Sequence, residues 1–379
     1  MAMPDDAPAA APPEGLSLFL SVPPGLEAAL AAEAAEQGFA VRGSEPGGVT
    51  LDGGWPEAWR ANLLLRGASK VLVRVGAFRA MHLAQLDKRA RKFPWDEVLR
   101  PDVAVKVEAS CRASRIYHAG AAAERVARAI RETLAAPVLP EADLRVMVRI
   151  EDDLCTISLD ASGEPLHRRG HKEEVGKAPM RETLAALFLR ECGYRGTEPV
   201  LDPMCGSGTF VLEAAEIALG LAPGRSRGFA FESLASFDPA AWAAMQAAAR
   251  PHDTALRFHG FDRDAGAVRM SAANALRAGV EGVTAFAQGD VADLPRPEGP
   301  PGLVIVNPPY GTRIGNRKLL FALHARMGAV LKERFRGWRV GLVTSDEGLA
   351  RATGLPWGPP GPHVPHGGLK VRLWRTDTI

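Results

Sequence analysis

Four consecutive residues, Asn307-Pro308-Pro309-Tyr310, have the side-chain types needed to hold the amino group of a nucleobase. Consecutive prolines fix the backbone and remove two amide donors, so that nearby carbonyl groups stay available as acceptors. The side-chain oxygen of Asn307 and the carbonyl of Pro308 can then accept both hydrogens of an exocyclic NH2 group, and Tyr310 offers a flat face for stacking. A plain strand terminator is the alternative interpretation.

A glycine-containing segment, Asp202-Pro203-Met204-Cys205-Gly206-Ser207-Gly208-Thr209, follows a short apolar run and precedes a helical pattern over 210–219. Gly206 and Gly208 let the backbone turn tightly and approach a ligand closely. In open α/β sheets ligands bind beyond the carboxyl ends of the strands, and this segment occupies such a position. An ordinary tight turn is the alternative.

Two acidic residues follow later predicted strands. Asp262, within Gly260-Phe261-Asp262-Arg263-Asp264, is placed to accept hydrogen bonds from ribose hydroxyls, although a helix cap is the alternative. Asp264 is expected to cap the helix over 265–278. Asp290, in Gln288-Gly289-Asp290-Val291, can accept from an adenine amino group, or it is an ordinary polar turn residue.

Repeated strand-then-helix units from residue 179 onward position these groups. The expected strands are 200–201, 256–260, 284–287, 303–306 and 339–343. This alternation predicts a parallel, doubly wound α/β sheet. Residues 371–374, after His366-Gly367-Gly368, predict a terminal antiparallel hairpin.

The N-terminal half has a different pattern. Residues 16–75 show the order β-α-β-β-α-β, which predicts a ferredoxin-like unit, with helices over 23–39 and 55–65. A second α+β block follows over 76–170, with helices over 83–99 and 121–134 and strands over 103–109, 146–150 and 154–159. Residues 1–15 are Ala/Pro-rich and acidic, and they predict a disordered tail.

Charge is distributed unevenly along the chain, although its formal net charge is only +2. Residues 1–59 contain one basic residue (Arg42) and nine acidic ones, whereas residues 60–172 contain 21 basic and 14 acidic ones, a net of +7. A basic block of this kind predicts a face that binds a polyanion, and a solvated charged surface is the alternative.

Cysteine usage favours a reducing, cytoplasmic compartment. The four cysteines form no C-x-x-C pair and have no histidine at metal-ligand spacing, so neither a disulfide framework nor a metal site is expected. No apolar run is long enough to cross a bilayer, and the first fifteen residues lack the basic start and apolar stretch of a signal peptide. We therefore expect no membrane partner, and the sequence leaves the oligomeric state open.

Residues 179–374 resemble the class I S-adenosylmethionine-dependent methyltransferases of the amino-methylating branch. The resemblance implies a Rossmann-like domain with a mostly parallel seven-stranded sheet over 171–379, with S-adenosylmethionine as cofactor. In that family the segment 202–209 surrounds the methionine end of the cofactor, and the acids matching Asp262 and Asp290 bind ribose and adenine. The implied cofactor contacts are Asp202, Pro203, Cys205, Gly206, Ser207, Gly208, Thr209, Asp262, Asp290 and Asn307. The implied catalytic residues are Asn307, Pro308 and Tyr310, and Cys205 is interpreted as a packing residue.

Residues 76–170 resemble a THUMP domain, an RNA-binding module, on the strength of Ser114-Arg115-Ile116-Tyr117-His118 and of the segment 159–170. With Lys177-Ala178-Pro179-Met180-Arg181, the chain is similar to the guanine-N2 methyltransferases of large-subunit ribosomal RNA (23S rRNA). The resemblance implies structured RNA as partner. The candidate RNA contacts are Lys88, Arg89, Arg91, Lys92, Arg115, Tyr117, Arg313, Arg317 and Lys318. Relatives usually carry Asn-Gly in the last hairpin, where this chain has His366-Gly367-Gly368, and the insertion over 222–250 varies in length among them.

Catalysis of such a transfer is expected to consist mostly of positioning, because an exocyclic amine must approach the methyl carbon in line with the departing sulfur. Three other functions stay open: a tRNA guanine-N2 methyltransferase, a DNA adenine-N6 methyltransferase, and a non-catalytic RNA-binding ribosome assembly factor. The RNA-type module argues against DNA, and the complete set of motifs argues against a non-catalytic role.

Overall fold

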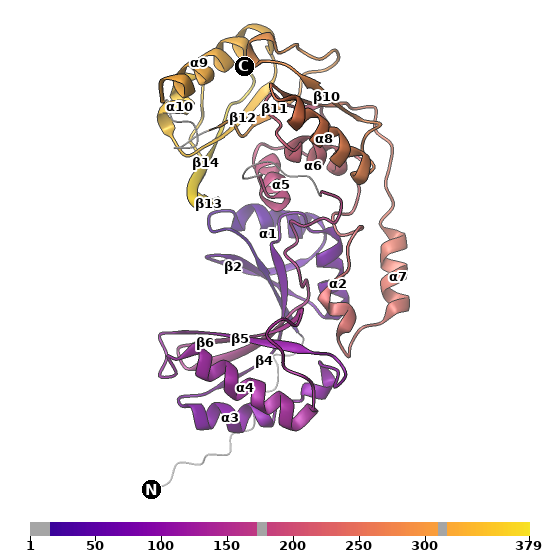
Figure 1. The fold of residues 1–379 in the computed structure, drawn as a ribbon, viewed down its shortest axis with the longest axis vertical. Coiled ribbons are helices and arrows are strands. Elements are labelled where there is room, and N and C mark those ends of the chain that lie inside the picture. Colours follow the sequence, from indigo (N-terminus) through magenta and orange to yellow (C-terminus); the bar gives the residue numbers. More distant parts are fainter. Residues whose placement is uncertain (1–15, 173–179, 310–316) are drawn as a thin grey trace. The chain divides into compact units, whose positions relative to one another are not determined.

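The computed structural model describes residues 16–172, 180–309 and 317–379, and these fall into two compact units (Figure 1). The first unit contains residues 31–166 and 227–248 with the N-terminal strand, and the second contains 23–30, 167–226 and 249–379. Each unit is built on one seven-stranded sheet. Among the described residues, no helix is long and apolar enough to cross a membrane.

The sheet of the first unit has the order β2-β3-β1-β4-β7-β6-β5. Its strand pairs are antiparallel except for the parallel pair β5–β6. The strands are β1 (Ser17–Ser21), β2 (Ala40–Glu45), β3 (Gly48–Asp52), β4 (Lys70–Arg79), β5 (Val105–Arg112), β6 (Leu144–Glu151) and β7 (Leu154–Asp160). The first four strands have the ferredoxin-like order that the sequence predicts.

Helices cover one face of this sheet, where alternate strand residues such as Val71 and Val73 are fully buried. The helices of the N-terminal half are α1 (Glu27–Glu36), α2 (Trp55–Leu64), α3 (Leu83–Arg91), α4 (Ala119–Leu134) and the short η1 (Trp95–Glu97). The predicted helix over 83–99 is wrong beyond Arg91. Pro94 disfavours a helical conformation at the preceding residue, so the chain leaves the helix there.

Strand β4 belongs to both halves of the first sheet, because it pairs with β1 on one side and with β7 on the other. The predicted domain boundary between residues 75 and 76 therefore falls inside a strand, next to an irregularity between Arg74 and Gly76.

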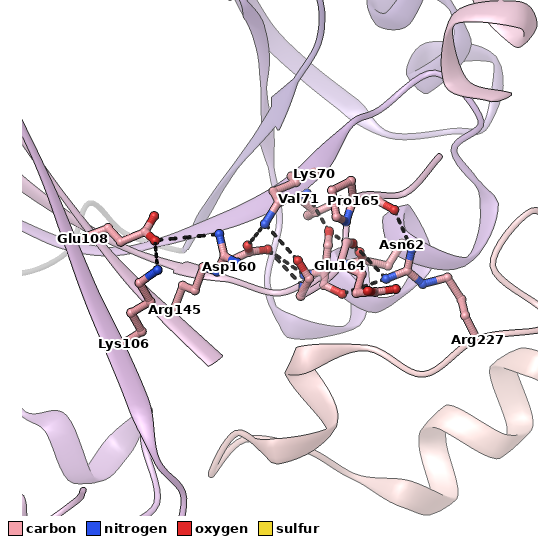
Figure 2. A network of polar contacts seen from close by, with 12 residues as sticks. Asn62, Lys70, Val71, Lys106, Glu108, Arg145, Asp160, Glu164, Pro165 and Arg227 are labelled. Atoms are coloured by element: carbon pink, nitrogen blue, oxygen red, sulfur yellow. Dashed lines mark hydrogen bonds and ion pairs between the residues drawn. The ribbon is translucent and has the colours of Figure 1, made fainter. Parts of the chain in front are cut away.

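A polar network joins β4 to the segment after β7 (Figure 2). Lys70 forms an ion pair with the buried Asp160, and the hydroxyl of Ser162 donates to Oδ1 of Asn62 on α2 at 2.6 Å. Arg227 donates to three carbonyl groups of the same segment at 2.8–3.2 Å. These contacts tie the start of the 227–248 insertion to the first unit.

The rest of that insertion packs in an aromatic cluster. Phe231 on η2 (Ala230–Ser233) lies 5.9 Å from Trp59 and 5.0 Å from Trp242 on α7 (Pro239–Ala248), measured between ring centroids. Residues 227–248 thus pack with the first unit, although they lie within the range 171–379 predicted as the C-terminal domain.

The sheet of the second unit has the order β10-β9-β8-β11-β12-β14-β13. The pairs from β10 to β12 are parallel, and β14 runs antiparallel to β12 and to β13. The strands are β8 (Val200–Asp202), β9 (Phe258–Asp262), β10 (Thr284–Gln288), β11 (Leu303–Val306), β12 (Arg339–Thr344), β13 (Val364–His366) and β14 (Leu369–Arg375). The helices are α5 (Glu182–Glu191), α6 (Thr209–Ala218), α8 (Ala265–Ala278), α9 (Arg317–Arg334), α10 (Glu347–Ala352) and the short η3 (Val291–Asp293). The predicted doubly wound, mostly parallel sheet and its terminal hairpin are confirmed.

Strand β11 lies in the middle of the second sheet and is buried along its whole length. A strand between two parallel neighbours has helices over both faces, so an uninterrupted Leu-Val-Ile-Val run is the sequence that this position requires. Val304 and Val306 belong to a core that includes Met327 of α9, Leu342 of β12 and Trp338. This core fixes the point at which Asn307 leaves the sheet.

Candidate functional site

A pocket of about 180 Å³ opens at the carboxyl ends of four parallel strands of the second unit. Each of the strands β8, β9, β10 and β11 contributes residues from the loop that follows it. The lining residues are Pro203, Met204, Asp262, Arg263, Gly289, Asp290, Val291, Asn307, Pro309 and Leu323. The structure thus brings Pro203, Asp262, Asp290 and Asn307 together, as the sequence motifs predict.

The loop over 203–208 turns sharply between β8 and α6. Gly206 and Gly208 have φ values of +56° and +84°, a region that side chains with a Cβ rarely adopt. A Cβ at Gly208 would also lie 3.1 Å from Oγ of Ser271, a tight contact, so the positive φ and the limited space both favour glycine here. The amide of Gly208 donates to the carbonyl of Cys205 at 2.8 Å and closes the turn.

Asp262 organises the loop as well as lining the pocket. Its Oδ2 accepts from the amide of Gly206 at 3.0 Å, and its Oδ1 accepts from the amide of Asp264 at 3.0 Å. Each carboxylate oxygen can accept a second hydrogen bond, so the side chain keeps acceptor capacity toward the pocket. Asp264 caps α8 through the amide of Gly266, which confirms that prediction.

Asp290 lines the same pocket from the loop after β10. Its Oδ1 accepts from the amide of Ala292 at 2.9 Å and caps η3. The amide of Gly289 donates to the carbonyl of Asp262 at 3.0 Å, which holds the two acidic loops together. Asp290 is thus both a cap and a pocket residue.

Other members of the predicted cofactor set lie behind the pocket wall rather than in it. Asp202 is 2% exposed and accepts from the amide of Met204 at 3.0 Å. Burial raises the pKa of Asp202 to about 8, and the nearby charge of Asp262 adds to this effect, against the hydrogen bond from Met204. Burial also raises the pKa of the Cys205 thiol, whose Sγ lies 3.7 Å from Oγ of Ser271. A buried, protonated thiol is a poor nucleophile, in keeping with a packing role for Cys205.

Asn307 is the residue that follows β11, and it lines the pocket together with Asp262 and Asp290. Its Oδ1 is buried and has no hydrogen-bond partner among the described residues. An unsatisfied buried acceptor costs about 1–3 kcal/mol, and because this one lines a pocket, it is a candidate acceptor for a donor on a bound molecule. Pro308 is buried and Pro309 lines the pocket. The predicted stacking residue Tyr310 and the predicted phosphate contact Arg313 lie outside the described residues.

Sequence reasoning missed several residues that support the site. Leu323 reaches the pocket from α9, far along the chain, and its helical spacing gives no sign of that position. Ser271 and Asn274 of α8 donate to carbonyl groups of the loop over 203–208. Their only signal in the sequence is a polar pair three residues apart in an otherwise Ala-rich helix.

The RNA-contact candidates of the first unit differ in their exposure and in their ion pairs. Lys88 and Lys92 are exposed on α3 and its C-terminal cap, one helical turn apart. Arg91, by contrast, forms ion pairs with Glu132 on α4 and with Asp87 on its own helix. The hydrogen bonds to these two carboxylates raise the pKa of Arg91 above its usual value. Arg89 is partly buried on the same helix.

Arg115 and Tyr117 lie in the segment that leads into α4. The side chain of Arg115 is 71% exposed, and that of Tyr117 is 85% exposed, the largest exposure among the large hydrophobic residues of the described chain. The amide of Arg115 donates to Asp153 at 2.8 Å, so the backbone of this segment is fixed while both side chains stay accessible. In the second unit, Arg317 and Lys318 are exposed at the start of α9, and Arg317 lies 3.4 Å from Asp346.

The parallel strands β10-β9-β8-β11-β12, closed by an antiparallel hairpin and with a pocket at their carboxyl ends, are the architecture of class I S-adenosylmethionine-dependent methyltransferases. Three family models match the chain in succession: the RlmL ferredoxin-like domain at residues 17–72, the THUMP domain at 80–160, and the RMKL-like methyltransferase domain at 169–355. The chain therefore belongs to the THUMP-domain methyltransferases of the RlmL-like family, and its cofactor is S-adenosylmethionine.

Individual relatives agree with this assignment. The chain is 41% identical over 215 residues to the ribosomal RNA large subunit methyltransferase K/L of Vibrio campbellii, a match that covers 55% of the chain and 30% of that relative. It is similar in structure to a predicted N6-adenine-specific DNA methylase from Listeria monocytogenes, with a TM-score of 0.86, 29% identity, and coverage of 96% of both chains. It is also similar to SMU.472, solved in complex with SAH, with a TM-score of 0.85, 27% identity, and coverage of 97% of this chain and 99% of that one.

The described residues fit this cofactor. Asp262 and Asp290 provide carboxylate acceptors on neighbouring loops for hydroxyl and amino groups, and Met204, Val291 and Leu323 provide apolar walls. Among the described residues, no group of three or more acidic, histidine or cysteine side chains could hold a metal ion.

Proposed function

We propose that this chain methylates the exocyclic N2 amine of guanine in RNA, with 23S ribosomal RNA as the substrate. The observation that carries the proposal is the buried Oδ1 of Asn307, which has no hydrogen-bond donor among the described residues and lies in one pocket with Asp262 and Asp290. A buried acceptor without a donor among the described residues is complementary to an N–H group of a bound base. The name of the Vibrio campbellii relative supports ribosomal RNA as the class of substrate.

In this proposal, S-adenosylmethionine supplies an activated methyl group, and the chain's own residues place the amine. Oδ1 of Asn307 and the carbonyl of Pro308 accept the two amine hydrogens, which orients the nitrogen lone pair toward the methyl group. The same two acceptors stabilise the positive charge that develops on the nitrogen. Tyr310 stacks on the flipped-out base and offsets part of the cost of unstacking, by about 1–3 kcal/mol.

The RNA-binding role is assigned to the first unit. Lys88, Lys92 and Arg115 are exposed cations that would contact phosphates, and Tyr117 is an exposed ring that would stack on an unpaired base. Phosphate contacts position the RNA without reading its sequence, so site choice would depend on RNA shape. A ribosomal RNA substrate also implies a cytoplasmic location.

The test is transfer of radiolabelled methyl groups to purified ribosomal RNA, transfer RNA and DNA, followed by mass spectrometry of the nucleosides. Labelled N2-methylguanine in 23S rRNA is the expected product, and the same nucleoside should disappear from RNA of cells that lack the protein. Labelled N2-methylguanine in tRNA alone would instead identify a tRNA enzyme, and N6-methyladenine in DNA would identify a DNA enzyme. Absence of label from every substrate would identify a non-catalytic RNA-binding protein.

A further inference from the structure

Two fully buried polar side chains of α8 form hydrogen bonds with the loop over 203–208, named here the cofactor loop. Ser271 and Asn274 are both 0% exposed, and they lie three residues apart on one face of the helix. Oγ of Ser271 donates to the carbonyl of Gly206 at 2.9 Å, and Nδ2 of Asn274 donates to the carbonyl of Ser207 at 3.1 Å. Two consecutive carbonyl groups of the loop are thus bonded to the same helix.

These bonds determine which way the loop presents its amides. The C=O and N–H of a trans peptide point in opposite directions, so carbonyl groups bonded to α8 turn the following amides away from it. The amides concerned belong to Ser207 and Gly208, and the second of them closes the turn on Cys205. The side chains of α8 therefore select one conformation of the loop.

Arg277 extends the hydrogen bonding one helical turn further. Its Nη2 donates to Oδ1 of Asn274 at 2.5 Å, and its Nε donates to the carbonyl of His171 at 3.1 Å. A guanidinium group only donates, so the Asn274 oxygen must face Arg277 and the Asn274 nitrogen must face the loop. Ordered in this way, the bonds run from His171 through Arg277 and Asn274 to Ser207.

The start of this chain of bonds is itself anchored inside the second unit. Nε2 of the buried His171 lies 2.9 Å from Oε1 of Glu216 on α6. The next residue, Lys172, donates to the hydroxyl of Thr209 at 2.8 Å and lies 2.9 Å from Glu182. Thr209 is the first residue of α6, directly after the cofactor loop. Ser207, near the C-terminal end of the loop, and Thr209, directly after it, are therefore both connected to residues 171–172.

We propose that Ser271, Asn274 and Arg277, named here the α8 clamp, are positioning residues that hold the loop over 205–208 in its cofactor-binding conformation. Through Arg277 the clamp makes that conformation depend on the placement of residues 171–172. The proposal rests on the proposed cofactor site, because the clamp acts on the same loop.

The test compares Asn274→Ala and Arg277→Gln with Arg269→Gln, an exposed arginine on the same helix that serves as the matched control. Calorimetry with SAH should show a dissociation constant raised about tenfold in Asn274→Ala, because one buried hydrogen bond to the loop is lost. Arg277→Gln should raise it by a smaller factor, and Arg269→Gln should leave it unchanged. Hydrogen exchange should accelerate in a peptide spanning 205–209 in both clamp variants, and the KM for S-adenosylmethionine should rise while kcat at saturation is retained.

Asp262→Asn separates failure of the clamp from failure of the cofactor site. Unchanged SAH affinity and unchanged exchange in both clamp variants, with weakened binding in Asp262→Asn, would overturn the clamp and leave the site in place. Unchanged binding in all three variants would overturn the site and the clamp with it. Arg277 is only partly buried, so Arg277→Gln decides the matter if Asn274→Ala does not fold.

Discussion

Asp262 at the end of β9 accepts a hydrogen bond from the amide of Gly206 at 3.0 Å, although the two residues are 56 positions apart in the chain. The carboxylate thereby fixes the loop that follows β8 and lines the pocket at the same time. A single side chain therefore connects the conformation of the loop over 203–208 to the pocket.

Asp262→Asn should weaken cofactor binding because an amide has one acceptor oxygen where the carboxylate has two. Either the amide of Gly206 or the amide of Asp264 loses its partner, at a cost of about 1–2 kcal/mol, and SAH affinity should fall by roughly tenfold or more. Calorimetric titration with SAH measures this. Glu281→Gln, an exposed acid after α8, is the control and should bind as the wild type does. Equal affinity for both variants would contradict the role of Asp262.

Asp202→Asn should change how stability depends on pH. Burial raises the pKa of Asp202 to about 8 in the folded state, whereas an unfolded Asp titrates near about pH 4. Between these values the folded state binds the extra proton, so this group makes the protein less stable as pH rises from about 4 to about 8. Asparagine keeps the acceptor for Met204 and cannot ionise. The variant should therefore gain about 1 kcal/mol or more over the wild type between pH 5 and pH 9.

Denaturant unfolding at pH 5, 7 and 9 measures this difference. If the wild type and Asp202→Asn lose stability in parallel across that range, Asp202 does not carry a buried proton.

Asn307→Ala should abolish methyl transfer and leave cofactor binding largely intact. The substitution removes the acceptor for the target amine, while Asp262 keeps its hydrogen bond from the amide of Gly206. Single-turnover transfer to rRNA and SAH calorimetry provide the two measurements. Full turnover in this variant would show that another group orients the amine, and a parallel loss of SAH affinity would show that Asn307 belongs to the cofactor contacts alone.

The double substitution Lys88→Gln/Lys92→Gln should weaken RNA binding without affecting stability, because both side chains are exposed. If each lysine neutralises one phosphate, the slope of log affinity against log salt should fall by about 1.4–1.8. Filter binding at several salt concentrations gives this slope. Lys106→Gln is the matched control, because Lys106 forms an ion pair with Glu108 at 2.8 Å on the sheet. An unchanged slope in the double variant would remove α3 from the RNA-binding surface.

The order of elements and the residue types at the strand ends could be predicted from local sequence patterns. The uninterrupted apolar run of β11 and the Asp-x-x-x-Gly-x-Gly pattern after β8 report local requirements, namely burial on both faces and a positive φ, and local requirements are visible in residue types. Asp264 as a helix cap follows from the same kind of evidence. The fold class and four pocket residues, Pro203, Asp262, Asp290 and Asn307, were predictable on these grounds.

Contacts between residues far apart in the chain could not be predicted from such local patterns. The continuity of one sheet through β4, the packing of residues 227–248 with the first unit, and the bonds from Asn274 to the cofactor loop depend on long-range contacts. The ion pair between Arg91 on α3 and Glu132 on α4 is another such long-range contact. A residue type states what a side chain can bond to, but only the folded chain brings one particular partner within hydrogen-bonding distance.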